Sequence, residues 1–347
     1  MPPTVTWPLA QRQRDFERWF APLIAEHRLD AATLRPASAD ASFRRYLRVD
    51  SADGRSCIVM DAPPPQEDVR PFIDVAARIA AAGLHGPTVL ASDVALGFVL
   101  LSDLGNTLYL AALTKANATQ ADQLMRDAIA ALVGWQTRVD ATGLPPYDHA
   151  LLLREVTLFP EWCVAREFNL TWTDAQHKSW NGVVQKLITR ALAQATVAVH
   201  RDWMPRNLMV SEPNPAILDF QDAVLGPISY DVASLLRDAF ISWDEAQELD
   251  WAVRYWEQAR DAGLPVPADF AEFWQDLEWM GLQRHLKVLG IFCRLKHRDG
   301  KPSYAEDLPR FFAYVTRVAG RYRELLPLLP LIEPMSGMAR TVAYSMR

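Results

Sequence analysis

The sequence has few cysteines and no long hydrophobic segment. Its three cysteines, Cys57, Cys163 and Cys293, lie far apart and form no CxxC pair, so we expect reduced, buried thiols rather than disulfides or a zinc site. No run reaches the roughly 18 apolar residues that a membrane-spanning helix requires. The N-terminus turns polar within a few residues and lacks the apolar core of a signal peptide. We therefore expect a cytoplasmic protein that binds no membrane.

Positive charge is in the minority. The chain carries 36 Lys and Arg against 42 Asp and Glu, a formal net charge of −6, which argues against a broad nucleic-acid-binding surface. Its 347 residues are 50% hydrophobic and 22% charged, the composition of an ordinary globular protein. That length is sufficient for two lobes with separate cores, and we place their boundary near residue 104.

The residues most suggestive of chemistry gather between positions 196 and 222, where short apolar runs flank polar segments. The polar residues of this stretch are His200, Arg201, Asp202, Arg206, Asn207, Asp219 and Asp222. Residues 207–210 and 216–219 alternate in the manner of a hairpin, and residues 211–215 supply its turn. Polar groups at the ends of buried strands are held in place by a rigid scaffold, which suits a functional site.

Phosphoryl transfer from a nucleotide requires this set of groups. Such a reaction needs an acceptor hydroxyl aligned with the phosphorus, and Mg²⁺ ions that neutralise the phosphate charge. Asp202 is suited to orient the hydroxyl and accept its proton, while Asn207 and Asp219 offer the oxygen ligands that Mg²⁺ prefers. His200 has no neighbouring His or Cys cluster, so it suits a brace of this loop better than a metal ligand.

The order and spacing of these residues resemble a known family. His200-x-Asp202-x4-Asn207, followed by Ile217-Leu-Asp219-Phe, is similar to the catalytic and metal-binding loops of the aminoglycoside phosphotransferase-like kinases. Residues 217–238 resemble one branch more closely, the bacterial anomeric kinases of N-acetylmuramate and N-acetylglucosamine. Further similarity covers most of the chain, at residues 41–49, 59–65, 100–105 and 158–162.

The resemblance implies an α+β, bilobal, protein-kinase-like fold. Residues 1–104 would form a nucleotide-binding lobe with a five-stranded antiparallel sheet. Residues 105–347 would form a larger, mostly helical lobe with the catalytic loop and a sugar pocket. It also implies ATP and Mg²⁺ as cofactors, with adenine bound at a hinge near Leu101 and Asp103.

The implied reaction is phosphorylation of the C1 hydroxyl of the two N-acetyl sugars, in cell-wall recycling toward UDP-N-acetylmuramate. Asp202 and His200 would form the catalytic loop, and Asn207 and Asp219 would hold the metal. The expected partner is a small amino sugar, with no nucleic acid, and the chain would act as a monomer. The candidates for sugar contact are Glu155, Trp162, Asp222 and Arg284. The alternatives are core packing for Trp162, a solvated charge for Glu155 and a solvated or salt-bridged face for Arg284. Asp222 also suits orientation of the Asp219 loop or contact with the metal.

The apolar strand that we expect at residues 56–60 departs from the family pattern. Related folds place a lysine late in this strand to hold the phosphates, yet no lysine occurs between Leu47 and Glu67. Either an arginine of the preceding hairpin substitutes, or nucleotide binding is weak or absent. The candidates for phosphate contact are Ser42, Arg44 and Arg45. The candidates for the carboxylate that normally pairs with the lysine are Glu67, Asp68 and Asp74.

Two other functions stay open. A kinase of another small molecule, such as an aminoglycoside or a different sugar, would use the same loop, because fold and catalytic loop do not specify the acceptor. An inactive, kinase-like binding protein is the second alternative, and the missing lysine favours it. The presence of Asp202, Asn207 and Asp219 together argues against it.

Overall fold

The computed structural model describes residues 5–39 and 43–345. Its helices and strands are α1 (Ala10–Glu26), β1 (Leu29–Ala39), β2 (Arg45–Ser51), β3 (Ser56–Asp61), α2 (Arg70–Ala81), β4 (Val89–Asp93), β5 (Phe98–Ser102), α3 (Tyr109–Lys115), α4 (Ala118–Arg138), α5 (His149–Leu158), the π-helix η1 (Phe159–Glu167), α6 (Asp174–Ala193), β6 (Thr196–Val199), the 3-10 helix η2 (Pro205–Asn207), β7 (Leu208–Met209), β8 (Ala216–Ile217), β9 (Val224–Pro227), α7 (Tyr230–Leu236), α8 (Glu245–Asp261), α9 (Phe270–His297), η3 (Pro302–Asp307), α10 (Leu308–Arg321), η4 (Leu326–Leu328) and α11 (Leu329–Ser345). Within these described ranges, no helix has both the length and the apolar character needed to cross a membrane.

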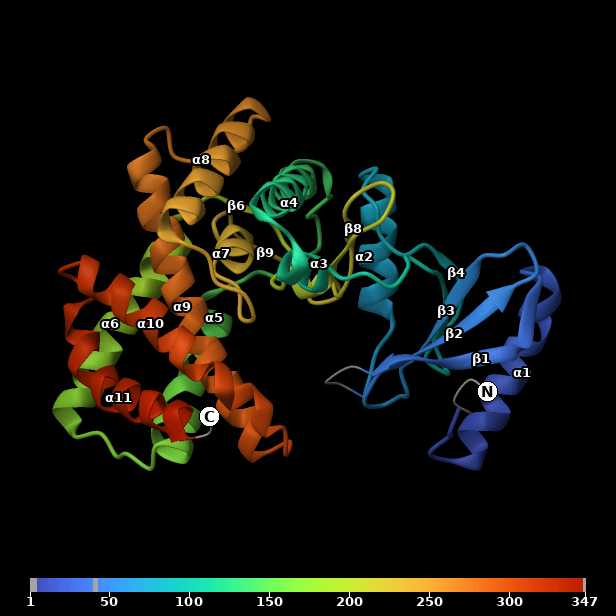
Figure 1. Cartoon of the computed structure of the whole chain (residues 1–347), viewed down its shortest axis with the longest axis horizontal. Coiled ribbons are helices and arrows are strands. Elements are labelled where there is room, and N and C mark those ends of the chain that lie inside the picture. The colour runs from blue at the N-terminus through green and yellow to red at the C-terminus, as the bar shows by residue number, and fades with distance from the viewer. Residues whose placement is uncertain (1–4, 40–42, 346–347) are drawn as a thin grey trace. The chain divides into compact units, whose positions relative to one another are not determined.

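The contacts between Cα atoms divide the chain into two compact units. The first unit is Met1–Ala112 with Arg206–Asp222, and the second unit is Leu113–Pro205 with Ala223–Arg347. The first unit holds a five-stranded sheet, and the second is mostly helical (Figure 1). The predicted α+β class, with a small β-rich part and a larger helical part, is therefore confirmed.

The sheet of the first unit has the strand order β1-β2-β3-β5-β4, and all neighbouring strands are antiparallel. Successive residues of a strand point to opposite faces. One face packs against helix α1, where Phe16 and Phe20 join Val59 and Phe98 in a hydrophobic cluster. In β2, Tyr46 and Arg48 alternate with the buried residues Leu47 and Val49, so they point to the opposite face of the sheet.

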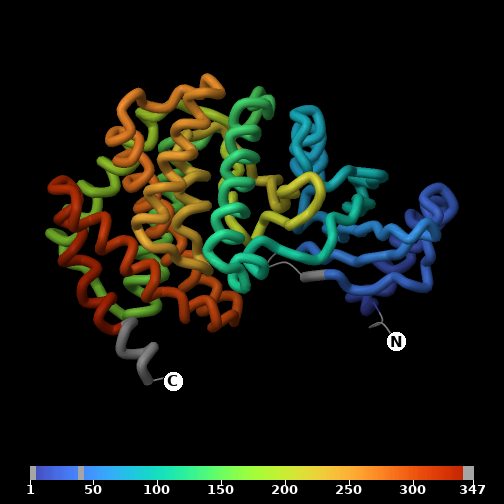
Figure 2. Tube along the Cα trace, turned by 45° about the horizontal axis from the view of Figure 1, so that its top comes forward, coloured from blue at the N-terminus to red at the C-terminus, as the bar shows by residue number. Residues whose placement is uncertain are grey.

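Strands β7 and β8 belong to the first unit although they lie far along the sequence. They form the hairpin that the alternation predicted. The Ile217 amide donates to the carbonyl of His85 at 2.9 Å, and the Phe220 ring lies 4.8 Å from that of Phe72 in helix α2. Figure 2 shows this yellow segment beside the blue-cyan helix. The compact unit is thus larger than the predicted lobe of residues 1–104, because long-range pairing attaches the hairpin to it.

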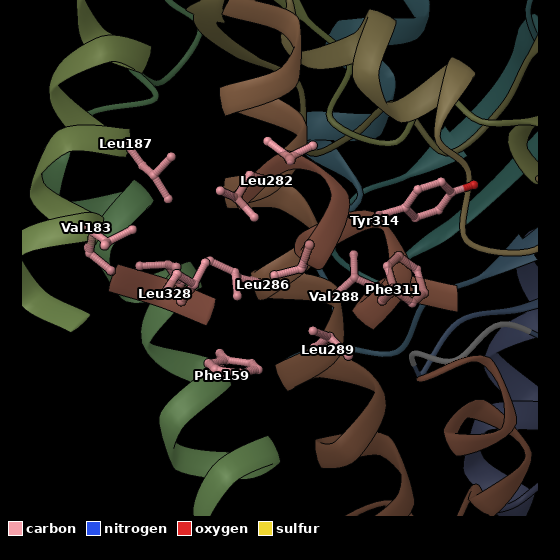
Figure 3. Packing of buried hydrophobic residues seen from close by; sticks show 14 of the residues in the cluster. Phe159, Val183, Leu187, Leu282, Leu286, Val288, Leu289, Phe311, Tyr314 and Leu328 are labelled. Atoms are coloured by element: carbon pink, nitrogen blue, oxygen red, sulfur yellow. The ribbon is translucent and has the colours of Figure 1, made fainter. Parts of the chain in front are cut away.

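The second unit is organised around helix α9. This helix contacts α5, α6, α7, α8, α10 and η1. Figure 3 shows Leu282, Leu286 and Leu289 of α9 in one hydrophobic core with Phe159 and Leu187. Because α9 is buried along most of its length, its polar residues are also drawn into the interior.

Helix α9 lies close against the last residue of helix α5 at Gly290. A Cβ atom added at this glycine would lie 2.4 Å from the carbonyl carbon of Leu158 and 2.5 Å from its oxygen. Real Cβ atoms do not come so close to backbone atoms, so only glycine permits this spacing of the two helices.

Replacing Gly290 by Ala should therefore lower the free energy of unfolding by roughly 1–3 kcal/mol, the usual cost of overpacking a core. The matched control is Gly182→Ala in the middle of helix α6, where nothing lies within 4 Å of the added Cβ. That change should raise stability by about 0.5–1 kcal/mol, because Ala favours helix over Gly. Urea unfolding followed by circular dichroism measures both. Equal effects of the two substitutions would contradict the proposed close approach.

Candidate active site

The first unit contains a cavity of about 450 Å³ beneath the sheet. Its lining combines strand, hinge and hairpin residues: Ala37, Tyr46, Arg48, Ile58, Phe72, Pro87, Leu101, Ser102, Asp103, Leu104, Gly105, Asn106, Leu108, Arg206, Asn207, Met209, Leu218 and Asp219. Four predicted site residues therefore share this cavity: Leu101, Asp103, Asn207 and Asp219. The predicted phosphate contact Ser42 lies outside the described residues.

The carboxylate of Asp103 fixes the part of the cavity wall that follows strand β5. Arg48 donates to it through Nε at 2.5 Å and Nη2 at 2.9 Å, and the Ser56 hydroxyl donates at 2.6 Å. Burial opposes ionisation of Asp103, but these donors lower the pKa of its carboxyl below the ordinary value. The Asp103 side chain is therefore engaged in tying the end of β5 to β2 and β3, so a ligand at the hinge would meet the backbone.

Asn207 and Asp219 meet at the open end of the β7–β8 hairpin. Asn207 Nδ2 lies 3.4 Å from Asp219 Oδ2, and Gln221 Nε2 donates to Asp219 Oδ1 at 2.9 Å. Asp219 has a φ angle of 59°, in the left-handed region that Asp tolerates better than most residues. The predicted sugar contact Asp222 is exposed at the end of this segment.

The two oxygen-bearing side chains fit a magnesium site. A carboxylate and an amide that lie side by side on a cavity wall offer the hard oxygen ligands that Mg²⁺ takes when substrate phosphates complete its coordination. No group of three or more His, Cys, Asp or Glu residues able to hold a metal exists in the described part of the chain. Asn207 and Asp219 are thus the residues that would hold a magnesium ion in this cavity.

The structure separates the two hairpin arginines. Arg44 Nη2 lies 3.6 Å from Asp219 Oδ1, and its Nε lies 3.9 Å from Glu67 Oε2. Arg45 instead pairs with the buried Asp61 at 2.6 Å. Because Arg45 is committed to this pair, its position argues against the expectation that it contacts phosphate. Arg44 is the one that reaches a cavity residue.

In the second unit, the loop after β6 is fastened by Asp231. Its carboxylate accepts the backbone N–H of His200 at 2.7 Å and that of Arg201 at 3.0 Å. Asp231 is completely buried, and burial raises the pKa of its carboxyl from 3.8 to about 7, although the two N–H donors oppose this shift. The loop that carries Asp202 thus has its backbone fixed from below.

His200 braces the same loop. Its ring is fully buried between Trp135 and Trp203, whose ring centroids lie 5.3 and 5.5 Å away. The Asp202 amide lies 3.3 Å from His200 Nδ1, in the position of a donor to that nitrogen. His200 therefore orients the backbone of Asp202, and its burial is unsuited to direct contact with a substrate.

A buried ionic network surrounds Glu155 in the second unit. Glu155 Oε1 lies 2.5 Å from Arg201 Nη2 and 2.9 Å from Lys287 Nζ, and the Tyr147 hydroxyl donates to Oε2. Burial opposes ionisation, but Lys287 and Arg201 lower the pKa of the Glu155 carboxyl. Burial alone would lower the pKa of Lys287, whereas Tyr230 and Glu155 raise it. Glu155 thus anchors the catalytic loop through Arg201.

Two other predicted sugar contacts lie inside the second unit. Trp162 is half-buried and packs against the hydrophobic core. Arg284 is only 2% exposed and interacts electrostatically with Asp231 and Asp238. This burial argues against the expectation that Arg284 meets the sugar, because its own unit shields the guanidinium from solvent.

Two cavity residues, Tyr46 and Arg48, were not predicted from the sequence, and neither was the meeting of Arg201 and Lys287 at Glu155. A signal was available for the first two. They alternate with buried apolar residues of β2, so they must share the face opposite the core. Arg201 and Lys287 are far apart in the chain, and no local pattern predicts that they converge.

Asp231 should make stability depend on pH. Because its folded-state pKa is raised, the folded state binds the proton more tightly, so this stabilisation is complete below about pH 4 and is lost as pH rises through about 7. Asp231→Asn removes the titration and one of the two acceptors, costing about 1–3 kcal/mol. Urea unfolding between pH 5 and pH 8 should show the gap between wild type and variant narrowing as pH rises. A gap independent of pH, or an equal loss in the exposed control Asp244→Asn, would contradict this role.

Known proteins are similar to this sequence over most of its length. Residues 33–273 match the phosphotransferase enzyme family. The chain is 54% identical over 310 residues to the N-acetylmuramate/N-acetylglucosamine kinase of Pseudomonas putida, covering 89% of this chain and 90% of that protein. It is 51% identical over 302 residues to the protein of the same name from Pseudomonas aeruginosa, covering 87% and 88%. The fold of the ADP-bound aminoglycoside phosphotransferase APH(2'')-Ib is similar, with a TM-score of 0.58 at 12% identity over 87% of this chain and 98% of that one. The chain belongs to the phosphotransferase enzyme family.

Proposed function

We propose that this chain is an ATP- and Mg²⁺-dependent kinase that phosphorylates the anomeric hydroxyl of N-acetylmuramate and N-acetylglucosamine. The observation that carries the proposal is the identity of 54% to a kinase named for these two sugars, over 89% of the chain. The residue types that phosphoryl transfer requires accompany that identity in the order and spacing of the family. The predicted sugar specificity rests on these relatives, since the fold alone is compatible with many acceptors.

The first unit would bind the nucleotide. Its cavity offers backbone near Leu101 and Asp103 for the adenine. Arg44, which lies beside the cavity residue Asp219, would contact the phosphates. Asn207 and Asp219 would hold Mg²⁺, which when bound neutralises charge on the phosphate oxygens. This assignment replaces the simple lobe of residues 1–104 with a unit that also includes the β7–β8 hairpin.

Asp202 would orient the sugar hydroxyl and accept its proton. It precedes Asn207 by five positions in the same loop, so the base and a metal ligand are joined by a short, braced segment. An anomeric hydroxyl is more acidic than an ordinary alcohol, so modest assistance from a carboxylate is sufficient. Asp231, His200 and the Arg201–Glu155 pair hold the backbone of this loop, so that little reorganisation is required during reaction.

The charges near Asp202 favour an acidic or neutral sugar over a polycation. Arg201 and Lys287 both interact electrostatically with Asp202, and both are cations. A polycationic aminoglycoside would be repelled by them, whereas N-acetylmuramate carries a carboxylate on its lactyl group. We therefore favour the amino-sugar substrate over the aminoglycoside alternative.

The proposal predicts transfer to N-acetyl sugars alone. Wild-type protein with Mg·ATP should convert N-acetylmuramate and N-acetylglucosamine into sugar 1-phosphates, and leave glucose and kanamycin unchanged. Phosphorus NMR of each product reads the position of the phosphate. Transfer to kanamycin would overturn the substrate assignment. Nucleotide binding without transfer to any of the four would instead favour an inactive, kinase-like binding protein.

Asp202→Ala should lower kcat roughly 10²- to 10⁴-fold, the usual contribution of a positioned general base. Binding of Mg·ADP and thermal unfolding should stay close to wild type, because the variant removes neither the cavity nor a loop anchor. Asp244→Ala, at an exposed aspartate of the same unit, is the control and should retain full turnover. Wild-type turnover in Asp202→Ala would place the catalytic base elsewhere.

A further inference from the structure

The first unit has no lysine at all. The earliest lysine of the chain is Lys115, and none occurs between residues 206 and 222. In strand β3, Ile58 lines the cavity and Met60 follows on the same face, fully buried. The strand position that would bring a cation to the phosphates is therefore apolar, and any phosphate-binding cation of this unit must be an arginine or a histidine.

Two of the three carboxylates near the start of α2 are already used locally. Asp68 pairs with Arg70 at 2.8 Å, and Asp74 pairs with Arg78 at 2.9 Å, four residues along the same helix. Both are surface pairs that close on their own segment. Neither is therefore directed toward the cavity.

The third carboxylate, Glu67, bonds to the β1–β2 hairpin instead. Glu67 Oε1 accepts the backbone N–H of Phe43 at 3.1 Å, and Oε2 lies 3.9 Å from Arg44 Nε. The Glu67 side chain is 18% exposed and that of Arg44 is 11% exposed, so solvent screens this pair only partly. A single carboxylate thus holds both the backbone and the side chain at the end of the hairpin.

Arg44 in turn connects Glu67 to the cavity. Its Nη2 lies 3.6 Å from Oδ1 of Asp219, which lines the cavity with Asn207. A guanidinium has five N–H donors in a planar fork, so it can contact a carboxylate on one edge and a phosphate on another. Glu67 sets the direction in which that fork points.

We propose that Glu67 positions Arg44, and that Arg44 held in this way binds the phosphates of the nucleotide. Arg44 takes the place of a strand lysine, and Glu67 takes the place of the helix carboxylate that pairs with it. The inference rests on the proposed function in that the ligand is a nucleoside diphosphate or triphosphate. Glu67 itself touches no phosphate. It acts through the hairpin, from the turn that precedes α2 rather than from the helix.

Two other arginines line the same cavity and are the natural rivals. Arg48 is occupied by Asp103 and by the Gly105 carbonyl at 2.9 Å, so it serves the hinge. Arg206 is exposed, and it precedes the proposed metal ligand Asn207. If Arg206 also contacts phosphate, its contribution should add to that of Arg44, because Arg206 comes from the segment of the β7–β8 hairpin and not from the β1–β2 hairpin that Glu67 contacts.

The test is a binding cycle with two ligands, Mg·ADP and adenosine, measured by isothermal titration calorimetry. Glu67→Gln should weaken Mg·ADP binding on the order of tenfold, within the usual range for coupled neighbours, and leave adenosine binding within about twofold, because only the phosphates depend on Arg44. Arg44→Ala should weaken Mg·ADP binding at least as much. The double variant should bind no more weakly than Arg44→Ala alone, because Glu67 acts through Arg44.

Matched variants separate positioning from a structural effect. Asp68→Asn removes a neighbouring carboxylate and should leave Mg·ADP affinity unchanged. Glu67→Gln combined with Arg206→Ala should give multiplied losses, unlike the combination with Arg44→Ala. Thermal unfolding of each variant checks the fold, and in kinetics the KM for ATP should rise in Glu67→Gln while the sugar KM does not.

Several outcomes would overturn the inference. It is wrong if Glu67→Gln binds Mg·ADP as tightly as Asp68→Asn does, or if adenosine loses as much affinity as Mg·ADP. It is also wrong if Glu67→Gln still causes its full loss of affinity in a protein that lacks Arg44. Failure of the proposed function is read separately, in the wild type. If wild type binds Mg·ADP yet phosphorylates neither amino sugar, the sugar assignment fails while the binding cycle still decides the role of Glu67.

Discussion

The loop that carries Asp202 depends on its hydrogen bonds to the buried carboxylate of Asp231. This carboxylate bonds the backbone of His200 and Arg201, the two residues directly before Asp202, from the first turn of helix α7. Arg201 has a φ of 76°, a left-handed conformation that costs a non-glycine residue about 1–2 kcal/mol. Such a conformation persists only where neighbours fix it. Here the Asp231 carboxylate holds the backbone, and Glu155 holds the Arg201 side chain at 2.5 Å. The loop is thus fastened on two sides, so the backbone that carries Asp202, the proposed base, is already ordered.

The parts of this arrangement that could be predicted from sequence are local. Alternation around a five-residue turn predicted the β7–β8 hairpin, and the hairpin necessarily brings its two ends together, so Asn207 and Asp219 meet as expected. The helix α2 is also local in origin, since its buried residues Phe72, Val75, Ala76 and Ile79 recur at helical spacing. In each case the physical cause, a strand period of two or a helix period of 3.6, lies within the segment itself. The sheet was predicted from resemblance and is confirmed.

The parts that could not be predicted depend on contacts between distant segments. Residues 224–227 form strand β9 because β6 offers them an antiparallel partner, and no local pattern specifies that pairing. Glu155 meets Lys287 only because α5 packs on α9, and Arg284 is buried for the same reason. The sequence also left Arg44 and Arg45 equivalent. Consecutive residues at the start of a strand face opposite ways, so one meets the cavity and the other meets Asp61. Which of the two does so is decided by the register of β2 against β3.

Moving a cation from strand β3 to the hairpin changes what must hold it in place. A side chain in the middle of a sheet is fixed by the ladder of hydrogen bonds around it. Arg44 lies just before the first residue of β2 and is therefore outside that strand. Such a residue needs an anchor from outside the sheet. The turn after β3 provides one: the Glu67 amide bonds the carbonyl of Pro63 at 3.2 Å, within a proline-rich segment that restricts the backbone. Phe43 and Arg44 contact the turn before α2 and not the helix itself. The carboxylate that anchors them therefore comes from this turn. In the proposed arrangement, the replacement of lysine by arginine and the shift of its carboxylate partner are therefore one structural change, not two.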